Sequence, residues 1–307
     1  MTASTLAPAP HFTTQLVSGL LAIKPLWAIA KAQARQMMIK RAERLGIPWR
    51  ETVRQWQQQD WQTDWQAIHN PGLTYPDYYQ ASFHGYDQGH LCWEAAFEFE
   101  VAANAVHASL YPEAGAQGDR RLRESYHEVL KAQLGYEPQA ILDLHCTVGL
   151  STFILQDYYP QATLTGLDFS PYYVTLAHYL GEAKQSGITW VHTLPEATSL
   201  PAQSFDLVSA FLLFHEMPQE PTRRIFREVR RLVRPGGAFT LMDMNPRSQA
   251  YLTMPPYIMT LLKSTEPFMD EYFALDLEQE LLAAGFDQVT ITPNSPRHRT
   301  VIAQVNV

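Results

Sequence analysis

The sequence predicts an α/β protein: a mostly parallel sheet of seven strands that ends in an antiparallel hairpin, preceded by an all-helical N-terminal domain. From residue 139 onward, short apolar runs alternate with segments of helical periodicity, which is typical of a parallel sheet with helices on both faces. The last two apolar runs, 286–292 and 300–305, are joined by a short Pro- and Ser-containing turn, whereas a parallel pair needs a longer crossover. Residues 1–118 show helical patterns instead.

Composition indicates a globular protein with a sizeable core. Hydrophobic residues make up 46% of the 307 residues and charged residues 18%. The net charge of −8 argues against nucleic acid as the main partner. The first 50 residues are basic, with Glu43 as their single acid. This basic start fits either peripheral contact with a membrane surface or docking on the acidic body, and we favour docking.

The compartment is predicted to be the cytoplasm. Cys92 and Cys146 are the only cysteines, so no disulfide framework is implied. The N-terminus lacks a basic segment followed by an apolar core, which a signal peptide requires. The longest apolar stretches are interrupted by Lys24 and Pro25 and fall short of the roughly 20 residues of a membrane span.

The N-terminal domain is predicted to contain two long helices and a helical lid. We expect a first helix over 12–46, kinked at Pro25, and a second over 51–68 whose tryptophans pack against the first. A glycine-punctuated aromatic run, 83–97, then leads into a helix with His90, Trp93, Glu94 and Phe97 on one face. This helix is either the lid of a small-molecule pocket or a boundary between surface and core, and the sequence leaves both open. The lid interpretation makes His84, Tyr86 and Glu94 secondary catalytic candidates.

A helix capped by Asp119 and ending near Leu134 marks the expected boundary between domains 1–118 and 119–307. The predicted strands that follow are 140–144, 163–168, 188–192, 205–213 and 238–243, with helices over 149–158, 171–186 and 218–233.

The loop after the first strand carries a motif. Residues 143–149 read Asp-Leu-His-Cys-Thr-Val-Gly between an apolar strand and a helical pattern, an arrangement that points backbone N–H groups at a ligand. The loop resembles motif I of the class I S-adenosylmethionine (SAM) methyltransferases, Asp-x-Gly-x-Gly-x-Gly. Asp143 and Gly149 match, while His145 and Thr147 replace the first two glycines. A side chain at 145 is strained wherever the turn needs a positive φ.

Later segments carry the same resemblance. The second strand ends at Asp168, which is placed to accept ribose hydroxyls, since Ser170 is available to cap the next helix. The resemblance implies that Phe169 packs on the adenine and that Glu196 accepts its amino group. The Pro-Gly-Gly turn at 235–237 also matches. The implied cofactor is SAM, held by residues at the ends of the first four strands: Asp143, His145, Cys146, Thr147, Gly149, Asp168, Phe169, Glu196, Ala197 and Ala210.

The resemblance implies a Rossmann-like methyltransferase of small molecules, similar to the ubiquinone and menaquinone methyltransferases. His215 is the first candidate for a general base, with Glu216 orienting it; the alternative is a strand-end histidine bonded to backbone. An apolar, aromatic insertion over 246–275 and the N-terminal domain are expected to build a pocket for a hydrophobic or aromatic acceptor. The acceptor, the atom methylated and the oligomeric state are not indicated.

A catalytically silent binding or scaffold protein with this fold is the main alternative, with His145 as its sign. A nicotinamide dehydrogenase does not fit the loop or the antiparallel ending. No metal site is expected, since the 11 histidines show no His-x-x-x-His and the two cysteines no Cys-x-x-Cys spacing.

Overall fold

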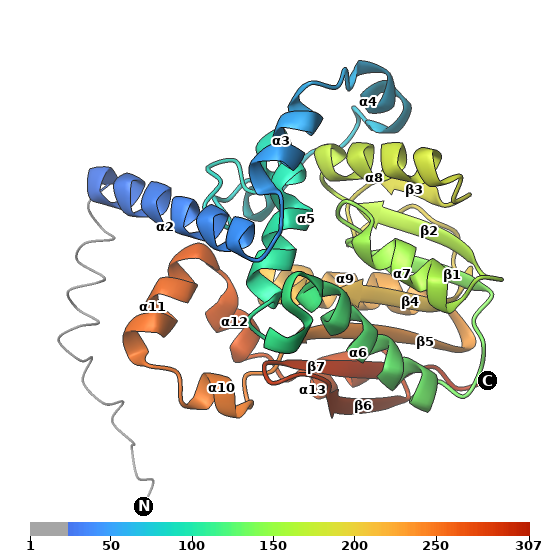
Figure 1. Ribbon diagram of the computed structural model, residues 1–307. Helices are drawn as coiled ribbons and strands as arrows, with labels where there is room; N and C mark the ends of the chain where they lie inside the picture. The colour runs from blue at the N-terminus through green and yellow to red at the C-terminus, as the bar shows by residue number, and fades with distance from the viewer. Residues whose placement is uncertain (1–23) are drawn as a thin grey trace, which may run out of the picture.

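A single seven-stranded sheet forms the centre of the protein, seen in a computed structural model that describes residues 24–307 (Figure 1). The strand order is β3-β2-β1-β4-β5-β7-β6. The first five strands run parallel, and β7 pairs antiparallel with both β5 and β6. This confirms the predicted α/β fold with a terminal antiparallel hairpin.

The element bounds follow the sequence pattern closely. The strands are β1 (Ala140–Leu144), β2 (Thr163–Asp168), β3 (Thr189–His192), β4 (Phe205–Phe211), β5 (Val233–Met244), β6 (Gln288–Pro293) and β7 (His298–Gln304). The helices are α2 (Lys24–Arg44), α3 (Trp49–Gln57), α4 (Gln62–Ile68), α5 (Trp93–His107), α6 (Gly118–Gln133), α7 (Leu150–Tyr158), α8 (Pro171–Lys184), α9 (Gln219–Leu232), α10 (Gln249–Leu252), α11 (Pro256–Thr265), α12 (Met269–Phe273) and α13 (Leu277–Ala283), with 3-10 turns η1 (Asp77–Tyr79), η2 (Pro112–Gln117) and η3 (Phe214–Glu216). β5 starts earlier than predicted because Val233 already pairs with Phe205.

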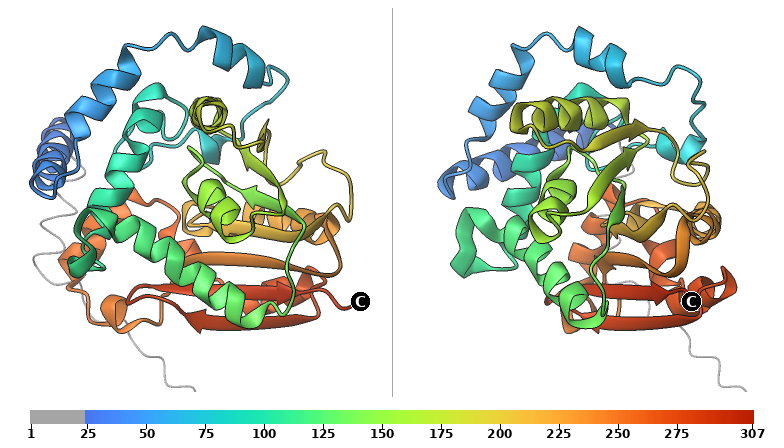
Figure 2. Two further views of the ribbon diagram at one scale, coloured as in Figure 1. Left: turned by 45° about the vertical axis from the view of Figure 1, so that its right-hand side comes forward. Right: turned by 90° about the vertical axis from the view of Figure 1, so that its right-hand side faces the viewer.

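Helices cover both faces of the sheet (Figure 2). Each face packs against them in its own hydrophobic core. On one face, α9 and α13 bury side chains such as Phe226 and Leu281 against β1, β4 and β5. On the other, α6 and α7 bury Leu122 and Leu155 against the same central strands. Burial on both faces explains why the central strands are continuous apolar runs. Since both faces of the central strands are covered by helices, the loops that could form a site meet at the carboxyl ends of these strands.

The N-terminal helices differ from the prediction in two ways. The helix expected over 51–68 is two helices, α3 and α4, because the Asp60 carboxylate accepts a hydrogen bond from the Gln62 N–H and starts a new turn. Its tryptophans pack on α8: the Trp61 ring lies 5.3 Å from that of Tyr179, and Trp65 contacts Tyr172. The N-terminal helices therefore share a core with α8. The domain boundary at 118 stays a prediction.

Two further expectations need correction. His90 does not share a helix face with Glu94, because α5 begins at Trp93 and His90 lies in the preceding loop. Asp119 is not a helix cap; it lies inside α6, buried between Arg123 and His107, at 2.7 Å from each. The kink at Pro25 and the helix before it fall outside or at the margin of the described residues. Within residues 24–307, no helix is long and apolar enough to cross a membrane.

His127 on α6 gives the fold a measurable pH dependence. It is buried, stacks on Tyr158 at 4.5 Å, and its Nδ1 has no hydrogen-bond partner among the described residues. Burial, with the charges of Arg123 and Lys131, lowers the pKa of His127 to about 3. The unfolded chain protonates this histidine near pH 6.5, so falling pH favours unfolding until the folded protein also takes up the proton.

We predict that lowering the pH from 7.5 to 5 reduces the free energy of unfolding of His127→Gln by about 2 kcal/mol less than that of the wild type. The difference arises because the variant lacks the histidine, and one pKa unit corresponds to ~1.4 kcal/mol. Urea unfolding at the two pH values measures this difference. Equal losses in wild type and variant would contradict it.

Candidate active site

The loop between β1 and α7 takes an unusual backbone path. His145, Thr147 and Gly149 all have positive φ values, 67°, 51° and 88°. Two of the three carry side chains in a conformation that glycine adopts most easily, at a strain of about 1–3 kcal/mol each. At Gly149 a Cβ atom would lie 2.9 Å from ring atoms of Phe153 and Trp190. The loop therefore keeps the path of the glycine motif without two of its glycines.

Asp168 at the carboxyl end of β2 holds this loop. Its carboxylate accepts hydrogen bonds from the backbone N–H groups of Thr147 (2.9 Å) and Ser170 (2.8 Å). His145 Nδ1 lies 3.0 Å from its Oδ2 atom. Although burial acts to lower it, Asp168 and Glu216 raise the pKa of His145 to about 10. Asp168, which the sequence predicts to bind the ribose, is fully buried under the loop.

The residues expected at the adenine are covered by η1. The Tyr79 ring stacks on Phe169 with 3.9 Å between centroids. Both Tyr78 and Tyr79 donate their hydroxyl hydrogens to Glu196. Burial, helped by Glu196, raises the pKa of Tyr79 well above its ordinary value. A ligand can stack on the face of Phe169 that Tyr79 covers only if this turn moves. Tyr78 and Tyr79 are not among the residues that the sequence singled out.

Four histidines and two glutamates meet beyond the end of β4. We call His84, His90, His145, His215, Glu216 and Glu266 the histidine–glutamate cluster. Its members come from the 83–91 loop, the loop after β1, η3, and the residue that follows α11. The 83–91 loop is tied down because His84 N–H donates to the Thr265 carbonyl (3.2 Å). Burial lowers the pKa of His90 to about 4. Burial acts to raise the pKa of Glu216, but the neighbouring histidines hold it below its usual range.

His215, the predicted general base, is oriented by a carboxylate. Its Nδ1 lies 2.8 Å from Oδ1 of Asp243, near the end of β5. The other Asp243 oxygen accepts from the backbone N–H groups of Phe214 and His215. Burial acts to lower it, but Asp243, Glu266 and Glu216 raise the pKa of His215 to about 9. The sequence analysis missed Asp243, although an acid near the end of the fifth predicted strand was a usable signal.

Two catalytic candidates are not brought into this cluster. The Tyr86 hydroxyl donates to Glu98 (2.7 Å), and Glu94 is largely exposed, with Arg35 at 2.9 Å. Among the predicted cofactor residues, Asp143 is buried and accepts from Thr152 (2.6 Å), and burial raises its pKa to about 7. The remaining residues, Cys146 and Ala210, are buried, and Ala197 follows Glu196 in the same turn.

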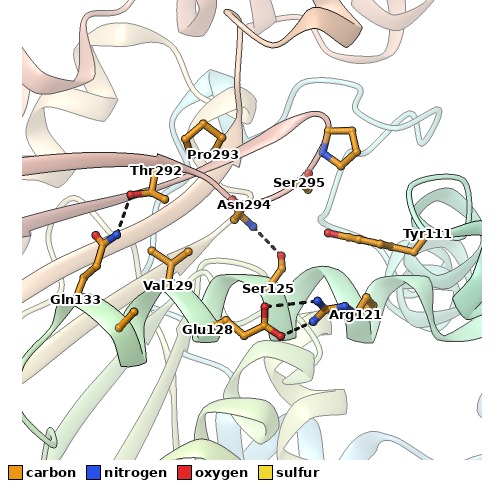
Figure 3. A pocket seen from close by; sticks show the side chains of 12 residues that line it. Tyr111, Arg121, Ser125, Glu128, Val129, Gln133, Thr292, Pro293, Asn294 and Ser295 are labelled. Atoms are coloured by element: carbon orange, nitrogen blue, oxygen red, sulfur yellow. Dashed lines mark hydrogen bonds and ion pairs between the residues drawn. The ribbon is translucent and has the colours of Figure 1, made fainter.

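A groove of about 500 Å³ elsewhere on the surface holds none of the predicted site residues (Figure 3). It lies between α6 and the β6–β7 turn. Several of its polar side chains pair with one another, Gln133 with Thr292 and Ser125 with Asn294, while the Tyr111 hydroxyl has no partner among the described residues. The groove therefore offers no competing constellation.

Comparisons with known proteins agree with the loop and the sheet. Residues 141–237 match the family model of a methyltransferase domain. An uncharacterized methyltransferase of Synechocystis sp. is 34% identical over 170 residues, which cover 54% of this chain and 76% of that protein. A ubiquinone biosynthesis O-methyltransferase of Coxiella burnetii is 25% identical over 167 residues, covering 53% of this chain and 70% of that enzyme.

Solved structures show the same fold. PigF with S-adenosylhomocysteine (SAH) aligns with a TM-score of 0.53 at 16% identity, over 70% of this chain and 60% of that one. A phosphoethanolamine N-methyltransferase 2 of Haemonchus contortus aligns with a TM-score of 0.52 at 12% identity, over 78% and 62%. At these identities the likeness concerns the fold alone.

The strained loop gives a direct stability test. We predict that Gly149→Ala destabilises the protein by about 3 kcal/mol or more, because strain at positive φ adds to the clash with Phe153 and Trp190. The matched control is Gly135→Ala, where φ is 73° but a Cβ meets nothing within 4 Å, so strain alone should cost about 1 kcal/mol. Chemical unfolding of both variants measures the difference. Equal losses of stability in the two variants would contradict this prediction, because they would show that the loop shifts to make room for the Cβ atom.

Proposed function

The chain belongs to the class I SAM-dependent methyltransferases, and we propose that it methylates a small hydrophobic or aromatic acceptor bound between the N-terminal helical region and segment 246–275. One observation carries this proposal: His215, fixed by Asp243, lies where the 83–91 loop and the end of α11 meet. Both segments that were expected to build the acceptor pocket thus reach the candidate base.

The chemistry of segment 246–275 supports a hydrophobic acceptor. On α10 and α11, the side chains of Leu252, Tyr257, Ile258 and Leu261 are exposed, although they are apolar. Exposed apolar side chains that lie this close together are typical of surfaces that take up apolar ligands or partners. Tyr251, packed on Phe273, anchors the segment to the body.

The residues that would hold SAM suit it chemically. Asp168 has a carboxylate for the ribose hydroxyls, Phe169 a ring for the adenine, and Glu196 an acceptor for the adenine amino group. In this conformation each of the three already has a partner. Asp168 contacts the β1–α7 loop and His145, Phe169 stacks on Tyr79, and Glu196 accepts hydrogen bonds from the hydroxyls of Tyr78 and Tyr79. We propose that η1 withdraws when the cofactor binds.

When bound, SAM supplies a methyl group already activated by its sulfonium. The chain then has to position the acceptor, exclude water and accept a proton where the acceptor loses one. Asp243 holds the His215 ring so that Nε2 faces the cluster, at 3.9 Å from both Glu216 and Glu266. With its pKa raised to about 9, His215 takes up this proton at Nε2 only in its neutral fraction, which grows as the pH rises toward 9. Asp243 stabilises the resulting imidazolium.

Two substitutions separate binding from catalysis. We predict that Asp168→Asn weakens SAH binding at least tenfold, because an amide cannot accept from two ribose hydroxyls as a carboxylate does. His215→Gln should leave SAH affinity within about threefold and lower turnover at least 100-fold, the usual contribution of a general base.

Isothermal calorimetry with SAH measures the first effect. The second is read as SAH formed from SAM with a panel of phenols and quinols. Unchanged turnover in His215→Gln would remove His215 from the mechanism. No SAH binding by the wild type at millimolar concentration would contradict the assignment of the cofactor residues.

A further inference from the structure

We propose that His84, His215, Glu216 and Glu266 bind one divalent transition-metal ion, with Zn²⁺ as the best chemical match, beyond the carboxyl end of β4. The site goes beyond methyl transfer and does not depend on it. An ion bound here would occupy Nε2 of His215, so the metal-bound form cannot use that nitrogen as the general base. Its four residues are separated in sequence by up to 182 positions, from 84 to 266, so no local spacing motif reveals them.

The candidate ligand atoms form two overlapping groups, His84, His215 and Glu266 in one and His84, His90 and Glu216 in the other, and within each group the atoms lie within 4.8 Å of one another. Nε2 of His84 lies 2.9 Å from Oε1 of Glu266 and 3.9 Å from Oε1 of Glu216. Nε2 of His215 lies 3.9 Å from Oε1 of Glu216 and from Oε2 of Glu266. A tetrahedral Zn²⁺ with bonds of about 2.0–2.1 Å holds its ligand atoms about 3.4 Å apart. The observed distances lie on both sides of that value, so small side-chain shifts complete the coordination.

The surrounding hydrogen bonds match those of a metal site. Asp243 accepts at Nδ1 of His215 and leaves Nε2 free to face the other ligands, the carboxylate–histidine arrangement common behind metal-binding imidazoles. Glu216 is held from its second oxygen, Oε2, which lies 3.6 Å from His90 and 3.5 Å from His145. Two of the four ligands are thus oriented from behind.

The cluster has two buried carboxylates whose ion-pair partners are all histidines. The side chains of Glu216 and Glu266 are 9% and 6% exposed. Within residues 24–307, every ion pair they form is with a histidine, and none is with lysine or arginine. Oε2 of Glu266 is buried without a hydrogen-bond partner and lies 3.9 Å from Nε2 of His215. A metal ion between these two atoms would satisfy the unpartnered oxygen and would replace the protons that the histidines otherwise carry.

The donor set selects the class of metal. Two imidazole nitrogens with two carboxylate oxygens suit Zn²⁺, Co²⁺, Fe²⁺ or Mn²⁺, whereas Mg²⁺ and Ca²⁺ prefer oxygen ligands throughout. His84 is 37% exposed and provides a path for the ion to enter from solvent.

Cobalt binding tests the proposal without any cofactor. The full chain, stripped with a chelator, is titrated with Co²⁺ and followed by its visible absorption. We expect one equivalent of Co²⁺ to give the intense bands of a tetrahedral complex, and Zn²⁺ to displace it. Wild-type protein that shows no saturable binding below millimolar Co²⁺ would overturn the proposal.

Variants then locate the ion. His84→Gln and Glu266→Gln should each weaken Co²⁺ binding at least tenfold. The control is His178→Gln, a histidine on α8 that lies 3.4 Å from Asp64 outside the cluster, and it should bind as the wild type does. Circular dichroism checks that each variant folds. His84 is partly exposed, so His84→Gln is expected to fold, and its result is used if Glu266→Gln does not fold. Unchanged binding in the folded ligand variants would overturn the site. SAH calorimetry on the metal-free protein tests the cofactor assignment separately.

Discussion

Two buried carboxylates, Glu216 and Glu266, determine how the N-terminal region meets the sheet. They lie beyond the carboxyl end of β4, and the groups that face them in the described part of the chain are histidines from separate segments. His84 links the 83–91 loop to the end of α11 in two ways: its backbone N–H donates to the Thr265 carbonyl, and its ring lies next to the Glu266 carboxylate. The loop, η3 and α11 are therefore fixed relative to one another by charge as well as by packing.

The departure from the glycine motif belongs to the same arrangement. His145 takes a positive φ that glycine would adopt without strain. In return, its ring lies between Asp168 and Glu216, and so joins the end of β2 to the end of β4. A glycine at 145 would relax the loop and lose this link. His145 is therefore a structural connection between Asp168 and the histidine–glutamate cluster.

The sequence was sufficient for the sheet, since buried parallel strands are continuous apolar runs and the hairpin turn is too short for a crossover. It also placed Asp168 at the end of β2 and His215 beyond the end of β4, which lie at one edge of the sheet because the carboxyl ends of parallel strands do. It did not reveal the break at Asp60, where a side-chain bond overrides helical periodicity. Tyr79, Glu266 and Asp243 were missed because their roles arise from contacts between distant segments. His90 was assigned to the wrong element because the sequence did not show that α5 starts only at Trp93.

We propose that η1 packs on Phe169 and Glu196, the two residues that would contact the adenine, so that cofactor entry requires η1 to move. A crystal structure of the protein with SAH tests this most directly. The account predicts that the adenine takes the place of the Tyr79 ring on Phe169 and that Glu196 exchanges the tyrosine hydroxyls for the adenine amino group. SAH bound while Tyr79 still stacks 3.9 Å from Phe169 would contradict it.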